Sequence, residues 1–166
     1  MASENIRAEV WGDMLDADRI TRYYQALADR HHRNTLLVRL ILAGSAMAGV
    51  VSFLAALPAY AQVTFGLVIA VAVVLDLVVD FQRKAAVLHT ITVDMRHNAV
   101  EWQDLWGRID GMNDNEARDR INALSHRMNT ITARTGDIGV GEDPRLNQRC
   151  AEATYAVFTQ QYGLSG

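Results

Sequence analysis

Two long apolar stretches follow each other in this chain of 166 residues, at 40–57 and 63–81, and only Pro58-Ala59-Tyr60-Ala61-Gln62 lies between them. A helix of about 20 apolar residues crosses a hydrocarbon core about 30 Å thick, so each stretch comes close to one crossing. Two crossings joined by a tight turn return the chain to the side from which it came. We therefore expect a transmembrane helical hairpin, with spans at about 36–57 and 63–81, that leaves all of the polar sequence in one compartment.

The charges beside the hairpin indicate which compartment that is. Basic residues precede the first span and follow the second, whereas the connecting turn carries no charge; they are Arg30, Arg33, Arg39, Arg83 and Lys84. Segments that flank spans on the cytoplasmic side are enriched in Lys and Arg. Both termini are therefore expected to be cytoplasmic.

The remaining sequence predicts helices. The chain contains only two prolines, Pro58 and Pro144, and no sustained run alternates with the period of a strand. We expect an all-α membrane protein with an N-terminal cytoplasmic helix (1–34), the transmembrane hairpin (35–82) and a cytoplasmic helical bundle (83–166). Within the last region one helix should begin near Asp114 and another near Pro144, and Gly163 should end the second.

A heptad pattern follows the second span. Residues at alternating spacings of three and four form an a/d seam, and one of them is polar: Leu88, Ile91, Met95, Asn98, Trp102, Leu105 and Ile109. A seam of this kind packs either against the other helices of the same subunit or against a second subunit. Both arrangements remain open from the sequence. We expect a homo-oligomer, which would use the second arrangement, because a polar seam residue such as Asn98 usually sets register or subunit number.

The first span carries small residues on one face. They recur around Gly44, Ala48 and Ser52, with Ser45 and Gly49 beside them. Small side chains let transmembrane helices approach closely. We expect this face to form a helix contact, either with the second span or with a neighbouring chain.

Two carboxylates near the end of the second span are the most informative polar residues. Asp76 and Asp80 are one helical turn apart, and a carboxylate in a membrane is costly unless it is paired or hydrated. Arg39 lies at about the depth of Asp80 in the predicted hairpin, so an Arg39–Asp80 ion pair is one interpretation. The other is a ring of carboxylates from several subunits along a cation path, in which Asp76, Asp80 and Arg39 line or flank the pore.

Enzyme chemistry has little support in the sequence. Asp94, His97 and Glu101 share a helix face, but no second copy of the motif supplies further metal ligands, so a solvated face is the preferred interpretation. Cys150 is the single cysteine. We expect no catalytic residues, no metal and no cofactor, and the net charge of −3 gives no reason to expect a nucleic-acid partner.

Three features of the chain occur together: the aromatic and basic segment RYYQALADRHHRNTLLVRLI at 22–41, the two expected spans with a very short turn, and the helical tail with tryptophans. In this organisation the chain resembles the SLATT family, two-transmembrane effector proteins of prokaryotic conflict systems. The resemblance implies a multi-pass protein of the bacterial inner membrane that oligomerises, forms a pore and disrupts that membrane during antiviral defence. A separate sensor protein or a nucleotide signal would activate it.

A different function fits the same layout. The hairpin would be only an anchor in the lipid bilayer, and the helical region would be a scaffold that docks a cytoplasmic partner. The two alternatives differ in what they expect of Asp76, whose charge matters for a pore and not for an anchor.

Overall fold

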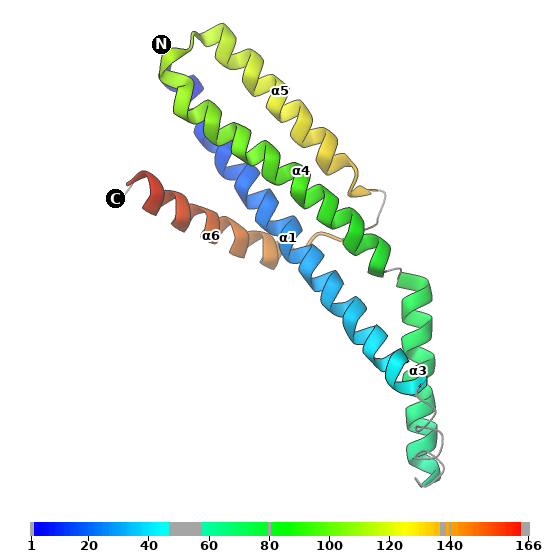
Figure 1. Cartoon of the computed structure of the whole chain (residues 1–166). Coiled ribbons are helices and arrows are strands. Elements are labelled where there is room, and N and C mark those ends of the chain that lie inside the picture. The colour runs from blue at the N-terminus through cyan, green and yellow to red at the C-terminus, as the bar shows by residue number, and fades with distance from the viewer. Residues whose placement is uncertain (1, 47–57, 80, 137–138, 140, 164–166) are drawn as a thin grey trace. The chain divides into compact units, whose positions relative to one another are not determined.

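The structure, a computed structural model, describes residues 2–46, 58–79, 81–136, 139 and 141–163; within its helices it does not describe the side chains at 42, 44–46, 72, 75–79, 81 and 82. These residues form α1 (Glu4–Ala46), α3 (Ala59–Val79), α4 (Phe81–Arg108), α5 (Asp114–Ala133) and α6 (Pro144–Tyr162), with a short 3-10 turn, η1 (Ile109–Gly111), after α4 (Figure 1). The described residues contain no strand. The all-α prediction is confirmed.

The chain divides into two compact units. Met1–Leu27 and Val87–Gly166 form one, which we call the four-helix unit because it holds the start of α1, most of α4, and α5 and α6. Ala28–Ala86 form the other, which we call the apolar unit. The part of α1 up to Leu27 thus belongs to the same unit as the C-terminal region, and the expected boundaries after 34 and 82 stay a prediction.

Helix α1 also runs further than the sequence indicated. It continues without interruption from Glu4 through Ala46, across the boundary expected after residue 34. The sequence holds no proline before residue 58 and no glycine between Gly12 and Gly44, so nothing there breaks the backbone hydrogen bonds. The change from polar to apolar sequence changes the environment that the side chains prefer. It does not interrupt the backbone hydrogen bonds, so the helix continues.

The starts of α5 and α6 follow local capping chemistry, as predicted. The Asn113 side chain accepts a hydrogen bond from the Glu116 backbone N–H (2.9 Å), and the Asp143 side chain accepts one from Leu146 N–H (3.1 Å) with Pro144 next to it. These bonds satisfy backbone donors that have no partner inside the helix. Gly163 ends α6 in the left-handed conformation (φ 67°), which glycine adopts without strain.

One apolar core holds the four-helix unit together. All four helices contribute buried residues to it, and Trp102 is the largest of the side chains that are fully enclosed. Two contacts bring the start of α1 beside the start of α5 and the end of α4: Ser3 N–H donates to Asp114 Oδ1 (2.8 Å), and Arg7 pairs with Asp110 (3.0 Å). Figure 1 shows α4 running antiparallel to both α1 and α5.

Candidate functional site

Helix α3 is the candidate site that the apolar sequence pattern indicated. It has 21 residues, and Asp76 is its single charged residue. Its large apolar side chains are exposed in the isolated chain: Tyr60, Val63, Phe65, Leu67, Val68, Val71, Val73 and Val74. At 100° per residue these positions spread around the whole circumference of the helix. An α-helix that is apolar on all sides belongs in a protein core or in a membrane.

The described part of the hairpin is incomplete. Within the part of the chain that the structure describes, no single helix combines the length and the apolar character that a bilayer crossing requires. Residues 47–57 of the expected first span and residue 80 of the second lie outside the described residues. Leu36, Leu37, Leu40 and Ile41, at the end of α1, are exposed like the side chains of α3.

The structure therefore describes the predicted pore residues only in part. Asp76 lies in the last turn of α3, but its side chain is not described, and Asp80 lies outside the described residues. Arg39 is exposed on α1. The Arg39–Asp80 pair stays a prediction.

The small-residue face is described only at its first positions. Gly44 and Ser45 belong to the last turn of α1, and their side-chain environment is not described. Ala48, Gly49 and Ser52 lie outside the described residues. The predicted helix contact stays a prediction as well.

Basic groups gather in the apolar unit next to the expected spans. Partial burial, followed by the positive charges of Lys84 and Arg30, lowers the pKa of His31 below its usual value. His31 is therefore biased toward the neutral form, since neighbouring cations and burial both disfavour the imidazolium. The charge beside the spans comes from the arginines and Lys84.

The heptad seam is buried inside a single chain. Its seven members are at most 5% exposed, and Leu88, Met95, Asn98 and Trp102 are fully buried. The Asn98 amide donates to the backbone carbonyl of Leu124 on α5 (3.1 Å). In the structure, the seam therefore packs against other helices of the same subunit. The same residues could form a seam between subunits only if the four-helix unit opened.

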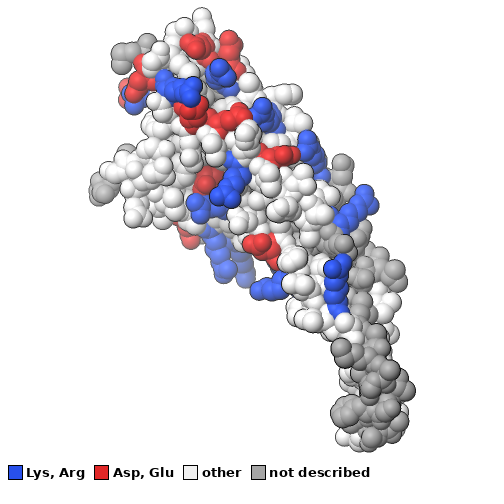
Figure 2. Space-filling view, viewed as in Figure 1, with Lys and Arg blue, Asp and Glu red and all other residues white. Residues whose placement is uncertain are grey.

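The polar face of α4 pairs with α5. Asp94 accepts a hydrogen bond from Arg134 (2.8 Å), and Glu101 pairs with both Arg127 and, at 3.0 Å, His97. Among the described residues no group of three His, Cys, Asp or Glu side chains is placed to hold a metal ion. Figure 2 shows that Lys and Arg are interspersed with Asp and Glu on the visible face of this unit. These contacts are those of a solvated helix pair.

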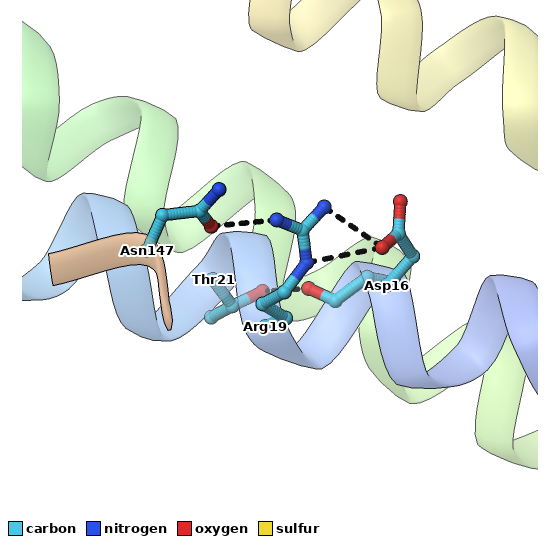
Figure 3. Close-up of polar contacts among 5 residues, drawn as sticks. Asp16, Arg19, Thr21 and Asn147 are labelled. Carbon is cyan, nitrogen blue, oxygen red and sulfur yellow. Dashed lines mark hydrogen bonds and ion pairs between the residues drawn. The ribbon is translucent and has the colours of Figure 1, made fainter. Parts of the chain in front are cut away.

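The contacts that attach α6 to α1 were not predicted from the sequence. Arg19 donates to Asp16 through Nε (3.0 Å) and Nη2 (2.8 Å), and its Nη1 donates to Asn147 Oδ1 (2.6 Å) across 128 residues (Figure 3). Thr154 of α6, which is 2% exposed, donates to Asp18 (2.8 Å). Only the Asp16–Arg19 spacing of three was visible in the sequence, because such a pair is local to one helix.

An aromatic cluster forms the other half of this attachment. The ring of Trp11 lies 5.1 Å from that of Trp106, 6.0 Å from Phe158 and 5.3 Å from Tyr162. Arg7 lies over the Trp106 ring at 5.7 Å from its centroid. The cluster joins α1, α4 and α6.

Comparisons with protein-family models, with curated proteins and with solved structures find no match to this chain.

Proposed function

We propose that the apolar unit inserts into a bilayer as a two-span hairpin and that the four-helix unit remains beside the membrane with both termini in the cytoplasm. The exposed apolar circumference of α3 carries this proposal. Leaving one such side chain in water costs about 1.5–3 kcal/mol relative to full burial, and a lipid environment removes that cost for all of them together. The basic groups beside the expected spans support the same orientation.

Within this arrangement, the chain acts as a pore-forming effector of the bacterial inner membrane. The proposal takes its biological setting, a prokaryotic defence or stress response, from the resemblance to SLATT proteins, and its chemistry from Asp76. A carboxylate in an apolar helix is expensive in lipid, and facing a hydrated path shared by several subunits removes that expense. The subunits would meet through the face of Gly44 and Ser45, because the α4 seam is already filled within one chain.

Membrane potential in bacteria that express the chain tests this function. Asp76→Asn removes the charge, and Asp76→Glu is the matched control because it keeps the charge and the polar character. The pore predicts depolarisation that Asp76→Glu preserves and Asp76→Asn alters, provided that immunoblots show equal amounts in the membrane fraction. Equal depolarisation by the two variants would remove Asp76 from the conducting path.

A second function, a membrane-anchored scaffold for a cytoplasmic partner, is favoured by one observation. The visible face of the four-helix unit carries both charge signs, and the seam of α4 is closed within one chain. An anchored scaffold needs no subunit contact and no charge in α3. It predicts normal membrane potential and equal behaviour of Asp76→Asn and Asp76→Glu.

A further inference from the structure

A cavity of about 390 Å³ lies in the four-helix unit, and its lining contains no residue of α3, the helix that carries the proposed function. Three elements meet around it: α1, the last turn of α5 with the residues after it, and the start of α6. The lining residues used below are Arg19, Tyr23, Tyr24, Thr132, Thr135 and Glu142. Ile20, Leu27 and Pro144 add apolar surface. A concave site with apolar walls and a few placed polar groups is the usual form of a small-molecule site.

The positive charge in the lining is already neutralised. Arg19 makes its ion pair with Asp16 at 2.8 Å, and a third N–H donates to Asn147. A guanidinium held by a carboxylate on one side and an amide oxygen on the other has little attraction left for a further anion. Arg19 therefore serves the structure of the cavity and gives it no net positive field.

Two carboxylates remain among the described residues of the lining, Glu142 and Asp143. Asp143 accepts a hydrogen bond from Leu146 N–H as the cap of α6. Glu142 is exposed and makes no hydrogen bond or ion pair with any residue that the structure describes. Its carboxylate is therefore available to pair with the charge of a ligand in this cavity.

The hydroxyl groups add acceptors to this negative charge. Thr132 Oγ1 donates to Met128 O (3.0 Å), and Thr135 Oγ1 donates to Thr132 O (2.6 Å), so both protons are used and the oxygens can only accept. Thr132 lies in the last turn of α5 and Thr135 follows that helix directly, at the end where the negative pole of the helix dipole lies. The lining favours a ligand that donates hydrogen bonds.

The two tyrosines supply a surface that suits a cation. The rings of Tyr23 and Tyr24 lie 5.6 Å apart in an edge arrangement, and both belong to the lining. Aromatic faces attract ammonium and guanidinium groups, and most strongly when water is partly excluded. Tyr23 is held in place because its hydroxyl accepts the Asp143 backbone N–H (3.0 Å).

We propose that this cavity binds a small organic cation, an alkyl ammonium or guanidinium compound whose charged end meets Glu142 and the tyrosine rings and whose apolar stem lies along Ile20 and Leu27. A phosphate or a nucleotide does not fit the lining, because it brings negative charge and acceptors to a site that already has both. The proposal is independent of the pore and of the scaffold.

Isothermal titration of the purified full chain in detergent tests the proposal, with agmatine as the probe because it carries a guanidinium and an ammonium on a four-carbon stem. The uncharged control ligand is 1,4-butanediol. We expect saturable binding of agmatine and none of the diol. Glu142→Gln should weaken agmatine binding by about tenfold or more, as the loss of a charge-assisted hydrogen bond does.

Two further variants make the result specific. Glu116→Gln, at an exposed acid outside the cavity lining, should bind agmatine like the unchanged chain. Tyr24→Leu keeps apolar volume and removes the ring, so it should weaken binding by a smaller factor, about twofold to fivefold. Absence of saturable agmatine binding, equal affinity in Glu142→Gln, or binding of inorganic phosphate in place of agmatine would each overturn the proposal.

Discussion

Asn98 is the polar residue in the buried seam of α4. It is completely buried, and its amide nitrogen donates to Leu124 O, whereas its Oδ1 and the nearby Trp102 Nε1 have no hydrogen-bond partner among the described residues. A buried polar atom without a partner costs about 1–3 kcal/mol. Asn98 thus lowers stability and fixes one pairing of α4 with α5, the role that a single polar seam residue has in coiled coils.

A charged side chain at position 98 should lower the free energy of unfolding far more than an apolar side chain does. Asn98→Asp places a carboxylate beside the Leu124 carbonyl with no donor, and we expect a loss of about 3 kcal/mol or more in the free energy of unfolding. Asn98→Leu removes the unpartnered oxygen and should stay within about 1.5 kcal/mol of the unchanged chain. Denaturation followed by tryptophan fluorescence measures both, because Trp11, Trp102 and Trp106 all lie in the four-helix unit. Equal losses in the two variants would contradict this account of Asn98.

Asp13 gives a prediction about pH. Partial burial, together with the charges of Glu9 and Asp16, raises the pKa of its carboxyl above the ordinary value of 3.8. A raised pKa in the folded state means that stability is lost as pH rises through that pKa, because the folded chain resists the charged form. Asp13→Asn should therefore stabilise the four-helix unit at pH 7, by less than about 1 kcal/mol because the group is partly solvated.

The gain from Asp13→Asn should shrink as the pH falls toward 3.8 and Asp13 itself becomes neutral. Asp16→Asn is the matched control, since Asp16 pairs with Arg19 and its loss should destabilise at pH 7. Urea unfolding at several pH values measures both variants. A gain that stays constant from pH 7 to pH 4 would rule out the titration of Asp13 as its cause.

Helix α6 is attached to the rest of the four-helix unit through one of its faces. Phe158, which is 2% exposed, packs into the core and against Trp11, while Tyr155 on the same helix is 64% exposed. Phe158→Ala removes the largest apolar contact of α6, for which the usual cost is about 3–5 kcal/mol. Hydrogen exchange should show loss of amide protection in α6 first, with α4 still protected.

Tyr155→Ala is the control for this prediction, because the exposed side chain should contribute less than about 0.5 kcal/mol. Equal loss of protection in α4 and α6 after Phe158→Ala would mean that the four helices open only as one cooperative unit.

The elements also show what could be predicted from the sequence. Helix starts at Asp114 and Pro144 and the end at Gly163 were predictable, because capping depends on residues three or four positions apart. The continuation of α1 past residue 34 was not, because the expected boundary rested on polarity and not on backbone chemistry. The heptad identified the buried face of α4, but its periodicity does not say which helix covers that face. The Arg19–Asn147 contact joins residues 128 positions apart, a distance over which sequence spacing carries no signal.

For the whole molecule, we propose that the four-helix unit is joined to a membrane hairpin formed by the apolar unit. Each unit has a distinct surface: mixed charges on the first, and exposed apolar side chains along α3 in the second. If the hairpin inserts, the first turn of α3, which contains Tyr60, lies outside the cytoplasm, and Tyr155 of α6 lies within it. Both side chains are exposed, at 76% and 64%, so single cysteines placed there would be accessible to reagents.

The most direct test is labelling of intact bacteria with a membrane-impermeant maleimide. The single-cysteine variants are made in a chain that carries Cys150→Ala, so that the native thiol cannot react. That thiol is already protected, because it is buried and its burial raises the thiol pKa, which slows its reaction. We predict that Tyr60→Cys is labelled in whole cells and that Tyr155→Cys is labelled only after the inner membrane is permeabilised. If Tyr60→Cys also requires permeabilisation, or if the chain is recovered outside the membrane fraction, the apolar unit does not form a hairpin that crosses the bilayer.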